Sequence, residues 1–159
     1  MNIRLIQPAD NSTLKMIIQQ GLAQHDLAIP GTAYFDPELD DLARYYAQSQ
    51  LRDYYVVEDQ GKVVGGAGFG EYLPDQGIAE LQKLYFAPEA KGHGWSYQLI
   101  NHIEEAARKA GYRKLYLETH SNLTAAIHIY EKAGFHLLEQ PIQAAAHQTM
   151  NRFYIKMLS

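Results

Sequence analysis

The segment from residue 78 to residue 118 constrains the fold more than any other part of the chain. Residues 78–86 are typical of a strand that ends before Pro88, and residues 94–110 carry apolar side chains at helical spacing. Gly111 follows as a helix stop, and residues 114–118 are typical of a second strand. A helix that connects two strands of one sheet is the crossover needed to join parallel strands. This unit predicts an α/β fold.

The remaining apolar patterns predict elements on both sides of this unit. A strand at 2–6 precedes a helix whose apolar stripe consists of Leu14, Ile17, Ile18 and Leu22. Asp36-Pro37 resembles an N-cap followed by proline, and it would open a helix with Leu39, Leu42, Tyr45 and Tyr46. A hairpin joins residues 54–57 to a strand that runs from 63 to 70, a helix extends from Asn122 to Gly134, and strands follow at 135–138 and 152–157. The order predicts a mixed central sheet of six to seven strands flanked by about four helices.

The strand at 78–86 and the strand before it carry two irregularities. Ala79 and Leu81 are apolar in one phase, whereas Leu84 and Phe86 are apolar in the other. One extra residue between Leu81 and Leu84, a β-bulge, explains this slip. The preceding strand contains glycine at 65, 66, 68 and 70, which we interpret as sites of close strand packing.

Size and charge limit the classes of function. The 159 residues contain no repeat or linker, so we expect residues 1–159 to form a single domain. The net charge of −4 argues against nucleic acid or an anionic membrane as the main partner. The absence of cysteine excludes disulfides, thiolate metal sites and a cysteine nucleophile. No stretch has transmembrane length and no signal-peptide core opens the chain, so we expect a cytoplasmic protein.

The turn at 91–96, Lys-Gly-His-Gly-Trp-Ser, lies between a strand and the long helix. Its glycines would let a phosphate approach the free N–H groups at the positive end of the helix. The alternative is a plain loop whose glycines only serve positive φ angles. A P-loop needs lysine and serine or threonine after its last glycine, and a dinucleotide fingerprint needs glycine where Tyr97 stands. Both motifs are therefore excluded.

Two segments resemble the GCN5-related N-acetyltransferases (GNAT family). Residues 80–88, Glu-Leu-Gln-Lys-Leu-Tyr-Phe-Ala-Pro, with the turn at 91–96, are similar to the acetyl-CoA motif, whose loop is Gln/Arg-x-x-Gly-x-Gly/Ala. Residues 122–135 resemble the helix Asn-x-x-Ala-x-x-x-Tyr-x-x-x-Gly-Phe. The element order matches from about Ile3 to Leu158, and several segments are similar to a bacterial small-molecule subgroup. The resemblance implies the acyl-CoA N-acyltransferase fold.

The resemblance also implies acetyl-CoA as co-substrate. The backbone of Leu84, Tyr85 and Phe86 would pair with the pantetheine arm like an added strand, and Asn122 would lie near the pantetheine. The pyrophosphate would bind at the turn, whose residues are Lys91, Gly92, His93, Gly94, Trp95, Ser96 and Tyr97. Three of them depart from the family pattern, because Lys91 replaces Gln/Arg, Ser96 replaces Gly/Ala, and Trp95 replaces a smaller aliphatic residue.

The implied reaction is acyl transfer from a thioester to an amine by direct attack. It calls for a proton acceptor for the amine and a donor for the leaving thiolate. Tyr130, on the inward stripe of its helix, is the candidate acid; the alternative is a core tyrosine. Glu80 is the candidate base, and Glu118 at the end of the neighbouring strand competes for this role. The alternative for Glu80 is a solvent-facing or ion-paired strand residue.

The histidines supply two further candidates. His120 and His147 would line the acceptor pocket, with ordinary surface or core histidines as the alternative. The other histidines lack metal-ligand spacing, so we expect no metal. The sequence thus predicts an acetyl-CoA-dependent N-acetyltransferase that acts on a primary amine of a small molecule or peptide, as a monomer or homodimer. An acyl-CoA-binding sensor domain without catalysis and an O-acetyltransferase on the same fold remain as alternatives.

Overall fold

A computed structural model describes residues 1–145 and 147–159 of the chain. One seven-stranded sheet runs through it in the order β1-β2-β3-β4-β5-β7-β6. The strands are β1 (Asn2–Leu5), β2 (Asp53–Asp59), β3 (Lys62–Leu73), β4 (Ile78–Phe86), β5 (Lys114–Thr119), β6 (His136–Leu138) and β7 (Arg152–Met157). Neighbouring strands are antiparallel except β4 and β5, which are parallel. The predicted mixed sheet and its parallel pair are confirmed.

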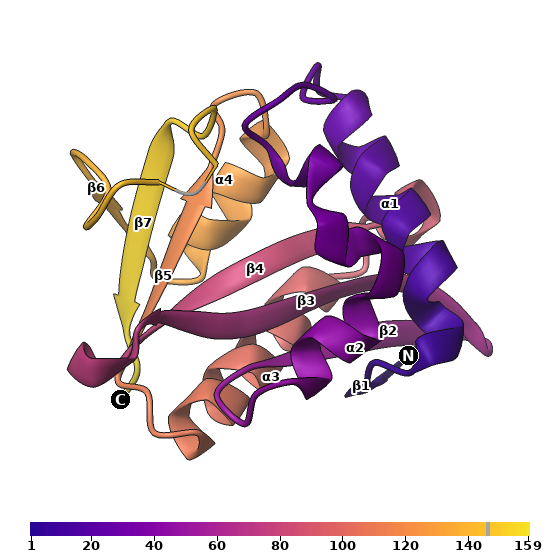
Figure 1. Cartoon of the computed structure of the whole chain (residues 1–159). Helices are drawn as coiled ribbons and strands as arrows, with labels where there is room; N and C mark the ends of the chain where they lie inside the picture. The colour runs from indigo at the N-terminus through magenta and orange to yellow at the C-terminus, as the bar shows by residue number, and fades with distance from the viewer. Residues whose placement is uncertain (146) are drawn as a thin grey trace.

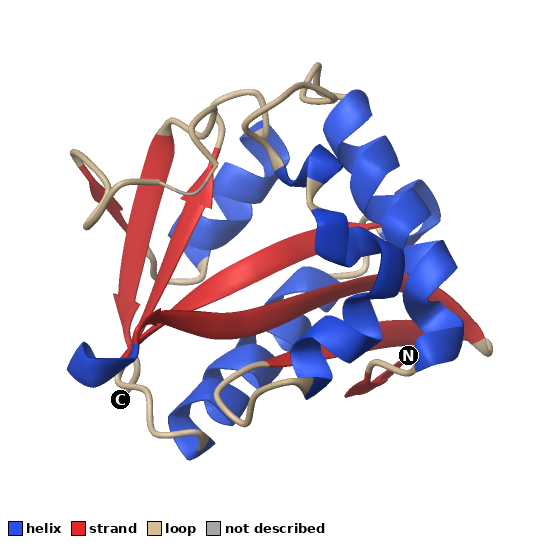
Figure 2. Cartoon of the chain, in the orientation of Figure 1, coloured by secondary structure: helices blue, strands red, loops and turns tan. Residues whose placement is uncertain are grey.

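Helices cover both faces of this sheet (Figures 1 and 2). They are α1 (Asn11–Ala23), α2 (Leu42–Ala47), α3 (Trp95–Lys109) and α4 (Thr124–Lys132). Below α1 and α2 lies one apolar core, which includes Leu14, Leu22 and Tyr54. On the other face α3 and α4 enclose a second core around Leu99 and Leu117. None of the helices in the described residues has the length and apolarity that a membrane crossing needs.

Two helix starts differ from the sequence prediction. Residues 37–41 form a 3₁₀ turn (Pro37–Asp41) ahead of α2, and the Asp36 carboxylate does not cap it. That carboxylate instead bonds side chains that arrive from other parts of the fold. Likewise α4 starts at Thr124, and the Asn122 side chain donates to the backbone carbonyl of His25 at 2.9 Å. In both cases a tertiary partner has taken the side chain that a local cap would use.

The predicted β-bulge is present in β4. Gly66 of β3 pairs with Tyr85 and Gly68 pairs with Gln82, so β4 holds one more residue than β3 over this stretch. Lys83 carries the irregularity, because its φ of 51° lies in the left-handed region. Its carbonyl oxygen accepts a hydrogen bond from the Tyr54 hydroxyl at 2.9 Å. The bulge turns the Lys83 side chain towards the loop that precedes α2.

The parallel strands β4 and β5 separate after three residue pairs. Ile78, Ala79 and Glu80 pair with Lys114, Leu115 and Tyr116. Beyond Glu80 the two strands continue without pairing to each other, and Figure 1 shows them diverging. The carboxyl end of β4 therefore has a free edge that faces the opening. Open α/β sheets bind ligands at such carboxyl ends.

Candidate active site

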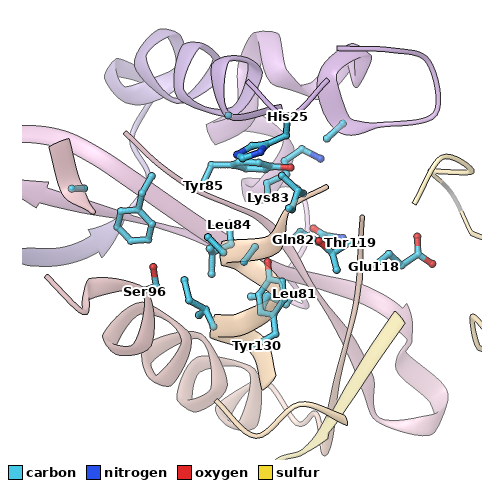
Figure 3. A pocket seen from close by; sticks show the side chains of 18 of the residues that line it. His25, Leu81, Gln82, Lys83, Leu84, Tyr85, Ser96, Glu118, Thr119 and Tyr130 are labelled. Atoms are coloured by element: carbon cyan, nitrogen blue, oxygen red, sulfur yellow. The ribbon is translucent and has the colours of Figure 1, made fainter. Parts of the chain in front are cut away.

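A cavity of about 670 Å³ occupies the opening between β4 and β5. Residues 80–86 of β4 run along it, and residues from α1, α2, α3, α4, β5 and the connecting loops complete the lining. In Figure 3, Ser96 and Glu118 lie at opposite ends of the view, with Leu84 and Tyr130 between them. Its volume is that of a site for a cofactor-sized ligand. One continuous cavity therefore joins the glycine turn to the carboxylates.

The glycine turn ends at the N-terminus of α3. Gly92 and Gly94 have φ angles of 85° and 73°, and a Cβ atom on either would meet nothing within 4 Å. Backbone conformation rather than crowding therefore requires glycine at both positions. Gly94 is the N-cap of α3, and no side chain caps the helix. Its first N–H groups are available to an anion.

Six of the seven predicted turn residues line the cavity: Lys91, Gly92, Gly94, Trp95, Ser96 and Tyr97. His93 does not line it, and its ring stacks on Trp95 at 4.3 Å between centroids. The pyrophosphate role of this turn remains a prediction.

Leu84, Tyr85 and Phe86 line the cavity along the free edge of β4. The Tyr85 ring packs against α1, where a Cβ atom on Gly21 would lie 2.8 Å from it. Glycine at position 21 thus makes room for this ring. Burial raises the pKa of Tyr85 above its ordinary value. The three residues leave backbone groups unpaired towards β5, as the binding of an added strand requires.

Tyr130 projects from α4 into the middle of the cavity (Figure 3). Only 7% of the residue is exposed, and its ring packs against Phe135 and Tyr154. Its hydroxyl forms no hydrogen bond with the described part of the chain. Burial raises the pKa of this hydroxyl. Tyr130 is therefore a protonated donor that a ligand in the cavity can reach.

Glu80 and Glu118 lie at the other end of the cavity, on the two strands that separate. The Glu80 Oε1 atom accepts from Gln82 Nε2 at 2.9 Å, and Glu118 Oε2 accepts from the Tyr116 hydroxyl at 2.9 Å. The second oxygen of Glu118, Oε1, is buried without a partner in the described residues. Burial raises the pKa of both carboxyls, and the Glu80 charge adds to the effect on Glu118. Neither forms a salt bridge with a described residue.

A partly buried ionic cluster, in which Lys83 is the most buried member, closes the same end. Lys83 Nζ lies 2.7 Å from Asp36 and 3.3 Å from Glu38, and His147 Nε2 lies 2.9 Å from Asp36. The hydrogen bond to Asp36 raises the pKa of His147. His147 lines the cavity, and its role in binding the acceptor remains a prediction. The sequence reasoning missed Asp36, Lys83 and Glu38, because their contacts join positions 45 to 111 residues apart.

Besides His93, the structure leaves two predicted residues, His120 and Asn122, outside the cavity lining. His120 accepts the backbone N–H of Asn122 through Nδ1 at 3.0 Å, and neither residue lines the cavity. His25 lines it instead, and no motif in the sequence marks this residue. The described residues include no group of three or more His, Asp or Glu side chains arranged to hold a metal ion.

Comparisons with known proteins identify the family to which this chain is similar. A sequence model of the acetyltransferase (GNAT) family matches residues 22–135. The chain is 36% identical over 147 residues to YjgM, an uncharacterized N-acetyltransferase of Escherichia coli K12, covering 91% of this chain and 87% of that protein. It is 30% identical over 124 residues to the spermidine N(1)-acetyltransferase of Vibrio cholerae, covering 74% of this chain and 71% of that protein.

Solved structures share the fold over nearly the whole chain. A GNAT-family acetyltransferase of Staphylococcus aureus Mu50 superposes with a TM-score of 0.86 at 17% identity, covering 99% of both chains. The putative acetyltransferase yncA of Salmonella typhimurium, solved with its cofactor acetyl-CoA, gives a TM-score of 0.76 at 22% identity, covering 100% of this chain and 94% of that one. The family match extends over more than half of the chain. This protein therefore belongs to the GNAT acetyltransferase family, as an acetyl-CoA-dependent N-acetyltransferase.

Proposed function

We propose that this protein transfers the acetyl group of acetyl-CoA directly to a primary amine of a small molecule or peptide, with Tyr130 as the general acid. One observation carries the proposal. A single cavity extends from the uncapped N-terminus of α3, along the free edge of β4 and past Tyr130, to Glu80 and Glu118. An anionic group suits its first end and an ammonium group suits its last.

The cofactor would occupy the first part of the cavity. The backbone N–H groups from Gly92 to Tyr97 and the positive end of α3 would hold the pyrophosphate. The unpaired edge of Leu84–Phe86 would hydrogen-bond the pantetheine arm as a neighbouring strand would. The structural relative yncA was solved with acetyl-CoA. This arrangement brings the thioester to the level of Tyr130.

An acceptor that binds as an ammonium ion loses two protons on becoming an amide: one restores the proton that Tyr130 gives to the thiolate, and the other is released to solvent. The amine nitrogen forms a bond to the acetyl carbon, the carbon–sulfur bond breaks, and the thiolate receives a proton from the Tyr130 hydroxyl. A carboxylate, Glu80 or Glu118, accepts the proton that the amine must lose, directly or through one water. The raised pKa of Tyr130 keeps it protonated until the thiolate forms, and the raised pKa of the glutamates makes them better proton acceptors. No covalent enzyme intermediate is needed.

The charge balance at the far end supports an amine as acceptor. Lys83 and His147 are held by Asp36, and Lys83 also by Glu38, and among the described residues no cation bonds directly to Glu80 or Glu118. An incoming ammonium group would supply the missing positive charge. The relative from Vibrio cholerae, a spermidine N(1)-acetyltransferase, is named for an amine substrate.

Tryptophan fluorescence tests the cofactor site, because Trp95 is the only tryptophan and lines the cavity. We expect a saturable change in emission on addition of acetyl-CoA at micromolar concentration. Gly94→Ala should weaken this binding, because alanine is strained at the φ of 73°. Gly111→Ala is the matched control, with a φ of 101° at the opposite end of α3. Absence of binding to the wild-type protein, checked by calorimetry, would refute the cofactor site.

A thiol-release assay then tests the acceptor, and the cysteine-free chain adds no background. Monoamines, diamines, amino acids and peptides with free N-termini would be compared with hydroxyl compounds of the same shape. We expect turnover with amines alone. Turnover with the hydroxyl compounds would favour an O-acetyltransferase, and cofactor binding without any turnover would favour a sensor domain.

A further inference from the structure

A buried chain of hydrogen bonds connects α2 to the Glu80 carboxylate. The Tyr46 hydroxyl donates to Gln82 Oε1 at 2.7 Å, and Gln82 Nε2 donates to Glu80 Oε1 at 2.9 Å. Tyr46 is 2% exposed and belongs to the core below α1 and α2. Gln82 lines the cavity beside Glu80. The side-chain amide of Gln82 is therefore fixed at both of its polar atoms.

The two hydrogen bonds run in one direction, from the Tyr46 hydroxyl through the Gln82 amide to the Glu80 carboxylate. Because the Tyr46 hydroxyl donates to the amide oxygen, the Gln82 nitrogen faces the carboxylate, and nitrogen can only donate. An ionised carboxylate only accepts, so the arrangement matches an ionised Glu80. A protonated Glu80 that turned its O–H towards Gln82 would meet a second donor. The hydrogen bond thus fixes the orientation of the carboxyl group and favours its ionised form.

Glycine on the neighbouring strand makes room for this amide. A Cβ atom on Gly70 would lie 2.9 Å from Gln82 Oε1 and 3.1 Å from Nε2, although the φ of Gly70 does not require glycine. Gly68 has the same relation to Tyr46, whose Cε1 atom would lie 3.1 Å from a Cβ at that position. Strand β3 therefore has glycine at the two positions where the Gln82 and Tyr46 side chains pack against it.

We propose that Gln82 is a positioning residue for acetyl transfer: its amide, held by Tyr46 and seated over Gly70, aims the Glu80 carboxylate at the acceptor amine and keeps it ionised. Gln82 acts through Glu80 and needs no contact with the reacting atoms. The inference rests on the proposed function, in which Glu80 or Glu118 takes the proton of the amine. It favours Glu80, because Glu118 receives its hydrogen bond from a hydroxyl that can also accept one.

The electrostatic surroundings of Glu80 explain why one hydrogen bond matters. Burial raises the pKa of Glu80, and the Gln82 hydrogen bond is the largest opposing influence. The charged and titratable groups that face Glu80 from the elements around it are Asp36, Tyr46, Tyr72, Lys83, Glu118 and His147. The two basic groups among them, Lys83 and His147, are both engaged by Asp36. Gln82 is thus the neutral donor that offsets the cost of a buried negative charge.

The test compares three perturbations of the chain with one matched control. Gln82→Met keeps the approximate shape of the side chain and removes the N–H donor to Glu80. Gly70→Ala displaces the Gln82 amide, and Tyr46→Phe removes the hydroxyl that donates to the Gln82 amide oxygen. The control is Tyr112→Phe, another buried tyrosine, whose hydroxyl donates to the Leu51 carbonyl at 2.8 Å and does not line the cavity. If one variant fails to fold, the other two still test the inference.

The readouts are the pH profile of kcat/KM and the titration of the Glu80 carboxyl carbon by NMR in the ligand-free protein. Gln82→Met loses a hydrogen bond to the Glu80 carboxylate. The midpoint of its kcat/KM pH profile and the midpoint of its Glu80 titration should therefore both rise by about one pH unit. Gly70→Ala and Tyr46→Phe should give smaller shifts in the same direction, and Tyr112→Phe should give none. The KM for acetyl-CoA should not change in any of them.

An unmoved Glu80 titration in Gln82→Met would overturn the inference, whatever the activity. A rate that falls equally at every pH would also overturn it, because that result indicates a merely structural role. A Glu80 titration that moves in Gln82→Met, together with no amine turnover by the wild-type protein, would support the Gln82–Glu80 coupling and refute the proposed function. The two failures are therefore distinguishable.

Discussion

The buried Lys83 cluster predicts a large loss of stability in Lys83→Met. The Lys83 side chain is 7% exposed and lies 2.7 Å from Asp36 and 3.3 Å from Glu38. Methionine keeps the apolar stem and the backbone constraint but leaves two carboxylates without their cation. Removing one partner of a buried ion pair costs about 3–5 kcal/mol. Asp36 retains His147 and both carboxylates keep some solvent contact, so we expect a loss at or below the lower limit of this range, about 2–3 kcal/mol.

Urea unfolding of the ligand-free protein at pH 7 measures this loss of free energy, and thermal unfolding under the same conditions measures the change in Tm. A chain of this size loses about 2–4 °C in Tm for each kcal/mol, so the Tm should fall by about 4–12 °C. The matched control is Lys62→Met, since Lys62 is 72% exposed and lies 3.5 Å from Glu89. It should change stability by less than about 0.5 kcal/mol. A loss below about 1 kcal/mol in Lys83→Met, with native near-UV circular dichroism, would refute the view that this cation offsets buried charge.

Three other changes follow from single contacts. Tyr130→Phe should keep its affinity for acetyl-CoA and lower kcat at least about tenfold with the preferred amine, which steady-state kinetics and calorimetry check. His147→Gln should flatten the stability profile, since the Asp36 hydrogen bond raises the pKa of His147. This stabilisation is complete below about pH 6.5 and lost as the pH rises through the higher folded value, as unfolding at stepped pH would show. Gly31→Ala should destabilise the protein by about 1–3 kcal/mol in the same urea assay, because the φ of 81° disfavours alanine and a Cβ there would lie 2.3 Å from the Thr149 hydroxyl oxygen. Unchanged kcat, an unchanged pH profile or unchanged stability would contradict these three expectations in turn.

The backbone of the site could be predicted because its features are local or periodic. Side chains alternate strictly along a strand, so the slip between Leu81 and Leu84 required one extra residue, and the structure has it at Lys83. Gly94 at the start of α3 and Gly111 after its end were recognisable because positive φ angles select glycine. These features fix the bulge, the free edge of β4 and the helix N-terminus.

Polar contacts between distant segments could not be predicted in the same way. Asp36 precedes a proline and so resembles an N-cap, yet its carboxylate bonds Lys83 and His147, which are 47 and 111 residues away. Asn122 likewise bonds the His25 carbonyl instead of opening α4. A local pattern states what a side chain is able to bind, whereas the packing of loops decides which partner comes within reach.

The glycines of β3 show how far each kind of reasoning extends. Their spacing in the sequence indicated close packing without saying what approaches. The structure supplies the answer, because the Phe86 ring lies over Gly65, Tyr46 and Tyr54 lie over Gly68, and the Gln82 amide lies over Gly70. A larger residue at any of these positions would displace a group that lines the cavity or supports Glu80. The sequence therefore carries information about the site in a strand that contributes no side chain to the proposed chemistry, and only the pairing of β3 with β4 makes this information readable.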